Sequence, residues 1–131
     1  MSVHYRNPAG LHAPVDNMYS HVTVASGTVF CRIGGQVPVD EHGASVGAGD
    51  MEIQLRCCYE MVDRALRSEG LGWKNVIHLY TFTTQMDSYL AAEQAVARDF
   101  FGQTPPPSTL VEVTRLVDRD WLVEVQADAI G

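Results

Sequence analysis

A strand that breaks at two adjacent glycines is the feature that most constrains how this chain can fold. Residues 28–33 are predicted to form a β-strand, and Gly34 and Gly35 end it. Because glycine has no Cβ, this point allows backbone angles and close approaches that other residues forbid. Turn-forming residues follow the break, namely Pro38, Asp40, Gly43, Gly47 and Gly49.

Asp50 is expected to begin a helix after this loop. Its carboxylate is a favoured N-cap, and Glu52 follows in the first turn, where the helix dipole stabilises an anion. The helix is predicted to end near Ser68, and its apolar residues recur at helical spacing: Leu55, Cys58, Met61 or Val62, Ala65 and Leu66. By local physics alone, the stretch 31–54 is most simply a connection between a strand and a helix.

The remaining pattern predicts a single α+β domain over residues 1–131, of order ββαβαββ. Residues 1–18 are expected to be irregular, and a hairpin is expected from His21–Ala25 and Thr28–Gly34 about a turn at Ser26-Gly27. Further strands are expected over 75–83, 108–116 and 121–129, with a second helix over 86–101. Both helices should pack on one face of a single sheet.

Composition and charge exclude several classes of function. The net charge is −7 with no basic run, which argues against a nucleic-acid surface that neutralises phosphates. No apolar run approaches the roughly 20 residues that span a bilayer, so no membrane partner is expected. The start of the chain lacks the core of a signal peptide, and we expect a cytoplasmic protein.

Cysteine and histidine spacing gives no indication of a metal site. The chain has three cysteines, two of them neighbours, and its five histidines are scattered. We therefore expect reduced, structural thiols, no metal and no cofactor. Only His78 is a plausible member of a cleft.

The outer face of the predicted sheet carries aromatic side chains. If Ile77 and Leu79 face the helices, then Val76, His78, Tyr80 and Phe82 point the other way. Exposure of such a face would cost roughly 25 cal/mol per Å² of apolar area. The simplest cover is another copy of the chain.

One run of residues resembles a known family. It comprises Gly35-Gln36-Val37-Pro38-Val39-Asp40, then Gly43, Val46, Gly49-Asp50 and Gln54. Further matches are Tyr5-Arg6-Asn7-Pro8, Tyr19-Ser20-His21-Val22 and Leu122-Val123-Glu124-Val125. The sequence is similar to the Rid family, the reactive intermediate/imine deaminases or YjgF-like proteins. The resemblance implies a chorismate-mutase-like fold and a homotrimer with three ligand clefts at its subunit interfaces.

Glu124 is the main candidate for chemistry. Val123 and Val125 flank it on the last strand, so it lies on the outer face, where desolvation could make it a general acid or base. Spacing alone favours a structural ion pair, for example with Arg32. The resemblance implies that this glutamate orients or activates water.

Glu93 lies among the apolar residues of the second helix. The expected core stripe is Met86, Leu90, Ala97 and Phe100 or Phe101. The carboxylate is then either at the edge of the helix or inside a cavity, and the edge is favoured. Rid deaminases usually carry an asparagine near this point, so Glu93 or Gln94 departs from the pattern.

The clearest departure from the family is Ser108. The resemblance implies Pro-x-Arg-Ser/Thr here, with the arginine binding the substrate carboxylate through two parallel hydrogen bonds. This chain has Pro106-Pro107-Ser108-Thr109. Serine cannot form a cationic fork, so the chain resembles arginine-less Rid subgroups, and amino-acid imines are not its expected substrates.

Other residues match cleft positions of the family. Tyr19 and Gly35 do so, and Thr109 could bind an anionic oxygen or a water, while Tyr80 and Phe82 could stack on a flat ligand. Two functions remain open. One is an enzyme that uses Glu124 on an imine, enamine or carbonyl-type small molecule, and the other is a ligand-binding or chaperone-like trimer without catalysis.

Overall fold

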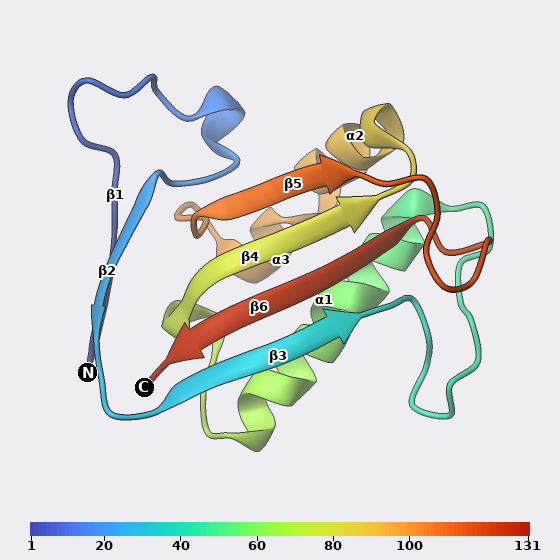
Figure 1. Cartoon of the computed structure of the whole chain (residues 1–131), viewed down its shortest axis with the longest axis horizontal. Coiled ribbons are helices and arrows are strands. Elements are labelled where there is room, and N and C mark those ends of the chain that lie inside the picture. The colour runs from blue at the N-terminus through green and yellow to red at the C-terminus, as the bar shows by residue number, and fades with distance from the viewer.

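A four-stranded mixed sheet, covered by helices on one face, forms the body of the chain (Figure 1), and the computed structural model describes residues 1–131. The strand order is β3-β6-β4-β5, in which β6 is antiparallel to both neighbours and β5 is parallel to β4. The strands are β3 (Phe30–Gln36), β4 (Val76–Thr83), β5 (Ser108–Glu112) and β6 (Val123–Ile130).

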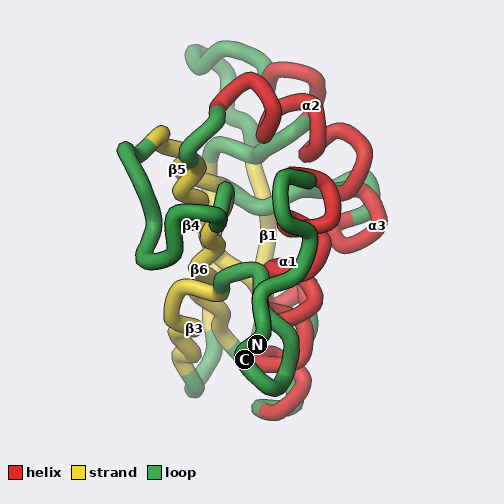
Figure 2. Tube along the Cα trace, turned by 90° about the vertical axis from the view of Figure 1, so that its right-hand side faces the viewer, coloured by secondary structure: helices red, strands yellow, loops and turns green.

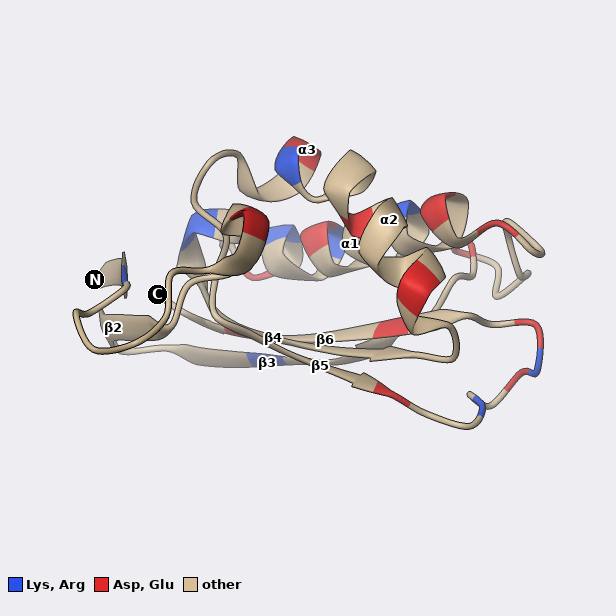
Figure 3. Ribbon diagram, turned by 90° about the horizontal axis from the view of Figure 1, so that it is seen from above, with Lys and Arg blue, Asp and Glu red and all other residues tan.

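The helices all lie on one side of this sheet, as Figures 2 and 3 show. They are α1 (Met51–Ser68), α2 (Met86–Val96) and α3 (Arg98–Phe101), with short 3-10 helices η1 (Val15–Asn17) and η2 (Trp73–Asn75). The α+β class and the placement of the helices on one face are as predicted. The outer face of the sheet carries no helix.

Asp50 caps α1 as expected, because its carboxylate accepts a hydrogen bond from the Ile53 amide at 3.1 Å. Apolar residues of α1 and β6, with others from β3, β4 and α2, then build the core, a cluster of 17 buried residues. Leu55, Val62 and Leu66 of α1 are fully buried in it. Alternate residues of β6 face the helices, so Glu124 points to the outer face.

The N-terminal part corrects the prediction. Residues 1–18 are not irregular, because β1 (Ser2–Arg6) pairs antiparallel with β2 (Val22–Ser26) as a separate two-stranded sheet, here called the N-terminal ribbon. The predicted hairpin is wrong, since β3 pairs with β6 instead of β2. The chain thus has two sheets rather than one. A Ser-Gly turn signal cannot distinguish a hairpin from a passage between sheets.

Four smaller corrections follow. The predicted second helix is divided into α2 and α3 at Ala97, and β5 ends at Glu112 rather than at residue 116. Val76 is fully buried in the core instead of facing outward, because the register of β4 shifts between Val76 and His78. Ile77, expected beneath the helices, is only half-buried. None of the helices combines the length and the apolar character that a membrane-spanning segment requires.

Candidate functional site

The glycine pair of β3 forms a bulge that receives a carboxyl group. The register between β3 and β6 shifts between Ile33 and Gln36, so Gly34 and Gly35 lie at the irregularity. A Cβ at Gly35 would overlap the Glu124 carboxyl. The close approach expected of these glycines is therefore made by Glu124, the carboxylate that the sequence also singled out.

Glu124 lies on the outer face of the sheet without an ionic partner. Its cross-strand neighbour is Phe82, and Arg32 forms its bidentate ion pair with Asp128 instead, at 2.8 and 3.0 Å. The structural pair considered for Arg32 and Glu124 is therefore not formed. Burial raises the pKa of the Glu124 carboxyl above its ordinary value, because desolvation disfavours the charged form.

Polar and aromatic groups of β4 and β5 share this outer face. The His78 ring packs on Tyr80 with centroids 4.3 Å apart, and its Nε2 lies 3.0 Å from the Thr109 hydroxyl. Burial lowers the pKa of His78, so the neutral imidazole is favoured. Between these side chains and the N-terminal ribbon lies a hollow of about 690 Å³, here called the outer groove, which reaches Thr23, Ile77, Ser108 and Asp128.

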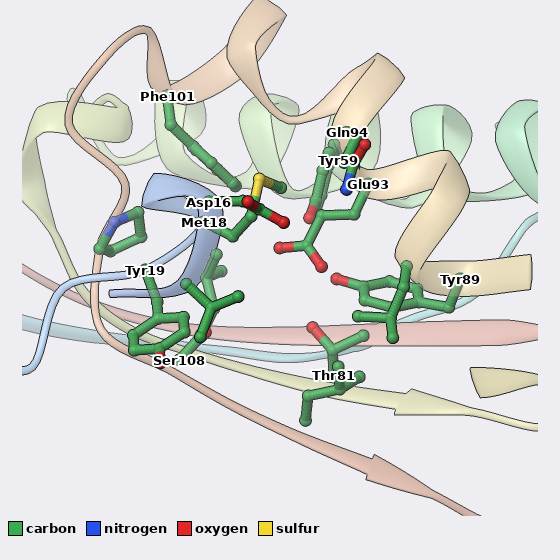
Figure 4. Close-up of a pocket in the computed structure, with 15 residues that line it drawn as sticks. Asp16, Met18, Tyr19, Tyr59, Thr81, Tyr89, Glu93, Gln94, Phe101 and Ser108 are labelled. Atoms are coloured by element: carbon green, nitrogen blue, oxygen red, sulfur yellow. The ribbon is translucent and has the colours of Figure 1, made fainter. Parts of the chain in front are cut away.

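A second hollow lies on the opposite face, between the sheet and α2. This inner cavity, of about 320 Å³, is lined from η1, α1, α2, β4 and β5. Figure 4 shows the Glu93 carboxyl directed into it, near the Tyr89 hydroxyl and opposite Thr81. Its mouth lies where Val15, Asp16, Leu90 and Gln94 are exposed.

Glu93 is almost completely enclosed, with 8% of its surface exposed. It therefore occupies the cavity rather than the edge of the helix, which corrects the favoured expectation. Burial raises the pKa of its carboxyl to about 7, although a hydrogen bond from Tyr89 partly opposes the shift. The carboxyl is thus balanced between its neutral and charged forms near neutral pH.

Two tyrosines of this cavity were missed in the sequence. Tyr59 of α1 and Tyr89 of α2 are buried, whereas Leu90, placed on the predicted core stripe, is 45% exposed. Tyr89 precedes Glu93 by four residues, so both lie on one face of α2. A stripe drawn through Tyr89 would have placed Glu93 on the inner side of the helix.

Tyr19 and Ser108 lie at the edge of the sheet and border both hollows. The Tyr19 hydroxyl lies 2.8 Å from Nε2 of His12. Ser108 faces the inner cavity from β5, and no lysine, arginine or histidine lines that cavity. No cationic fork replaces the arginine expected at this position.

The structure therefore places the predicted site residues on different sides of the main sheet. The outer-face group consists of Gly35, Tyr80, Phe82, Thr109 and Glu124. Glu93 lies beneath the helices, and Tyr19 and Ser108 lie between the two groups. Within one chain Glu124 lines neither hollow.

Residues 10–131 match the family described as Endoribonuclease L-PSP. A RutC family protein of Synechocystis is 30% identical over 119 residues, which cover 90% of this chain and 88% of that protein. A RutC family protein of Pyrococcus horikoshii is also 30% identical, over 111 residues and 85% of each chain.

Solved structures agree with this relationship. YyfB of Yersinia pestis, a Rid-family protein of unknown function, has the same fold with a TM-score of 0.91 over 100% of both chains, at 22% identity. TdcF of Escherichia coli, solved with bound serine, is 25% identical with a TM-score of 0.71, covering 100% of this chain and 98% of that one. The chain belongs to the Rid family of YjgF-like proteins, which is also described as Endoribonuclease L-PSP.

Proposed function

We propose that this protein is an enzyme that acts on an imine, enamine or carbonyl-type metabolite, with Glu124 as its general acid and base. Hydrolytic deamination is the reaction that we favour, and a related addition of water, tautomerisation or cyclisation uses the same proton transfers. The observation that carries the proposal is the unpaired Glu124 carboxyl held against Gly35 in the β3 bulge.

The chemistry needs a carboxyl that can exchange protons near neutral pH. In imine hydrolysis, water attacks the imine carbon while the Glu124 carboxylate accepts a proton from that water. The protonated carboxyl donates this proton to the nitrogen, which gives a carbinolamine. Glu124 then moves a second proton from the carbinolamine hydroxyl to the nitrogen, so the C–N bond breaks, ammonia leaves and a carbonyl group remains. The raised pKa of Glu124 supports both transfers, because it brings the group nearer to the working pH.

The substrate is expected to lack a carboxylate. Neither the inner cavity nor the outer groove contains a lysine or arginine among its lining residues. Arg32 forms an ion pair with Asp128 and is therefore not free to bind a substrate carboxylate. TdcF holds serine, an amino acid with a carboxylate, whereas Ser108 offers this chain no charged partner for such a group. Tyr80 and Phe82 would instead stack on a neutral, flat part of the substrate.

A homotrimer would complete the site. Glu124 lies on the open outer face in one chain, where Val111 and Phe30 are 40% and 56% exposed. A second copy seated on this face would exclude water from Glu124 and form an intersubunit pocket with Tyr80, Phe82 and Thr109. This enclosure would raise the pKa of Glu124 further.

The proposal is tested with 2-iminopropanoate and its neutral amide, each generated in the assay. We expect the protein to accelerate loss of ammonia from the amide and to leave the acid at the rate of buffer. Glu124→Gln keeps the shape but cannot titrate, so the rate should fall by about 10²–10⁴. Gly35→Ala should also slow the reaction, because the added methyl displaces the Glu124 carboxyl.

Glu60→Gln, on the exposed side of α1, is the matched control and should keep the wild-type rate. Full activity of Glu124→Gln would remove this residue from the mechanism. No acceleration of any neutral imine would favour the alternative, a non-catalytic ligand-binding or chaperone-like trimer. Rapid hydrolysis of 2-iminopropanoate would show that its carboxylate is bound without an arginine at position 108.

A further inference from the structure

A third hollow lies on the helical side of the chain, between α1 and the loop that joins β3 to α1 (Figure 1). This α1 groove, of about 590 Å³, shares no lining residue with the inner cavity or the outer groove. Its apolar lining consists of Val46, Ile53, Cys57 and Met61. None of these four belongs to the core cluster, and the proposed reaction does not use them, so this apolar surface needs a separate explanation.

Three of these residues form a second apolar stripe on α1. Ile53, Cys57 and Met61 recur at intervals of four residues, so they lie along one side of the helix. The stripe extends over about 12 Å, which is about two helical turns. Ile53 is 51% exposed, although it packs against the backbone of Gly47. Aliphatic surface of this length is therefore available to another molecule.

The loop that forms the other wall of the groove is held in place by hydrogen bonds. The Cys57 thiol donates to the Val39 carbonyl at 3.2 Å, which fastens the loop to α1. Within the loop, the Asp40 carboxylate accepts from the amides of His42 and Ala44 at 2.9 and 3.0 Å. The groove is thus formed before a partner arrives, which lowers the entropic cost of binding.

The charges around the stripe are mostly negative. Carboxylates line the groove from both walls, namely Asp40, Glu41, Asp50, Glu52 and Glu60. Two arginines also line it, and one of them, Arg56, forms an ion pair with Asp99 at 3.0 Å. Glu52 forms no ion pair, although Arg56 follows it by four residues on the helix. Acids beside aliphatic surface favour a partner that carries positive charge.

We propose that the α1 groove is a docking surface for a basic amphipathic segment of another protein. Its aliphatic side chains would cover the stripe from Ile53 to Met61, and its lysines or arginines would lie beside the acids. A segment of two helical turns matches the length of the stripe, as when an amphipathic helix binds in a groove. A second copy of this chain does not match the charge, because the chain has a net charge of −7 and no basic run.

The inference does not rest on the proposed reaction. Glu124 lies on the outer face of the main sheet, whereas the α1 groove lies on the helical side. Docking is measured without turnover, so its failure would leave the imine assay unchanged.

Fluorescence anisotropy with labelled synthetic peptides tests this docking surface. The probe is a peptide of about eight residues, as long as the stripe when helical, in which pairs of lysines alternate with pairs of leucines. One analogue has glutamate for lysine, which reverses the charge, and another has serine for leucine, which removes the apolar side. We expect the probe to bind with a Kd of about 100 μM or tighter at low salt. Each analogue should bind at least about tenfold more weakly.

Ile53→Ser should weaken binding of the probe about tenfold, because it removes the most exposed residue of the stripe. Glu52→Lys should weaken binding by a similar factor, because it reverses a charge beside the stripe. The matched controls are Val117→Ser, at an apolar residue that is 84% exposed, and Glu69→Lys, at the exposed end of α1. Both controls should bind the probe as tightly as the wild type does.

Several results would overturn the inference. Equal binding of the probe and its serine analogue, or equal losses in the variants and their controls, would indicate only a general attraction to an acidic protein. Absence of probe binding would also contradict it, and this test uses the wild-type protein, so it does not depend on the folding of a variant. If the probe does not bind and Ile53→Ser lowers the mass in sedimentation, the groove is an interface between copies of the chain instead.

Discussion

At the scale of single residues, two glutamates in this chain have raised pKa values for the same reason, because burial disfavours the charge of each. The two glutamates differ in the groups that surround each carboxyl. Glu93 has a tyrosine partner inside a cavity, and Glu124 lies across a bare glycine backbone on an open face. The first is the better buried, and its effect on folding is therefore the easier to measure.

Glu93 should make the stability of the protein fall as the pH rises. Its pKa is about 7 in the folded chain against an ordinary value of 4.5, so between these pH values the folded state holds a proton that the unfolded state has released. The contribution of Glu93 to the stability of the folded state is then most favourable below pH 4.5 and falls by up to about 3 kcal/mol as the pH rises to about 7. Glu93→Gln should therefore gain stability relative to the wild type on going from pH 5 to pH 8.

Urea unfolding at both pH values and at one protein concentration measures this difference. Glu60→Gln is the control and should track the wild type within about 0.5 kcal/mol. Parallel stability profiles of the wild type and Glu93→Gln would contradict the assignment of a raised pKa to Glu93.

Residue patterns identified part of the candidate site and could not identify the rest. The outward position of Glu124 follows from the alternation of side chains along a strand. The glycine at position 35 indicated a close approach to the backbone that a Cβ would prevent. Tyr59 and Tyr89 were not singled out, because large amphipathic residues on a helix are compatible with several faces. The cavity itself arises from how α2 packs over β4 and β5, which no local pattern encodes.

At the scale of elements, Gln54 connects α1 with the loop that precedes it and with residues 120–122, which are distant in sequence. Its side-chain amide donates to the carbonyls of Gly47 and Asp120, each at 3.1 Å, and accepts from the amide of Leu122 at 2.7 Å. The side chain is fully buried on the first turn of α1. It thereby fixes the start of β6, and with it the position of Glu124.

Gln54→Ala should destabilise the protein by about 3 kcal/mol, because it removes three hydrogen bonds of a buried side chain and leaves the Leu122 amide without the acceptor that Gln54 provides. Urea unfolding with a fit to a single transition measures the loss. Gln103→Ala, which removes the same side chain from an exposed loop, should cost less than about 0.5 kcal/mol. Similar losses in the two variants would mean that the Gln54 bonds contribute little.

Most elements were predictable because their signals are local. The Asp50 cap, the stripe of α1 and the strand at 76–83 are encoded within a few residues of each other. The predicted hairpin was wrong for the opposite reason. The true partner of β3 is β6, and the paired residues Arg32 and Asp128 are nearly a hundred residues apart in the sequence. A pairing over such a distance leaves no local signal in the sequence.

At the scale of the whole molecule, the two faces of the main sheet differ. Helices cover one face, and the other is open and partly apolar (Figure 3). Val111 lies on this open face at the β5 edge, beside Phe82. A chain of this kind is expected to bury that face in the proposed homotrimer rather than leave it in water.

Val111→Asp should prevent this assembly, since a carboxylate at a desolvated interface has no partner. Sedimentation equilibrium should give three times the 14.4 kDa chain mass for the wild type and a smaller mass for the variant. Val117→Asp is the matched control, because Val117 is 84% exposed in the loop before β6. A monomeric wild-type protein at micromolar concentration would refute the trimer.

The separation of the N-terminal ribbon from the main sheet also has a consequence for motion. The ribbon is joined to β4 through side chains, since the Tyr5 and Thr23 hydroxyls donate to the carbonyls of Val76 and Ile77. A two-stranded sheet has little stability of its own. Its amides should therefore exchange hydrogen with solvent through local opening, at a lower free energy than those of β6. Tyr19, part of the cavity wall, lies shortly before β2 in the chain, so we expect the same opening to loosen this wall of the inner cavity while the main sheet stays folded.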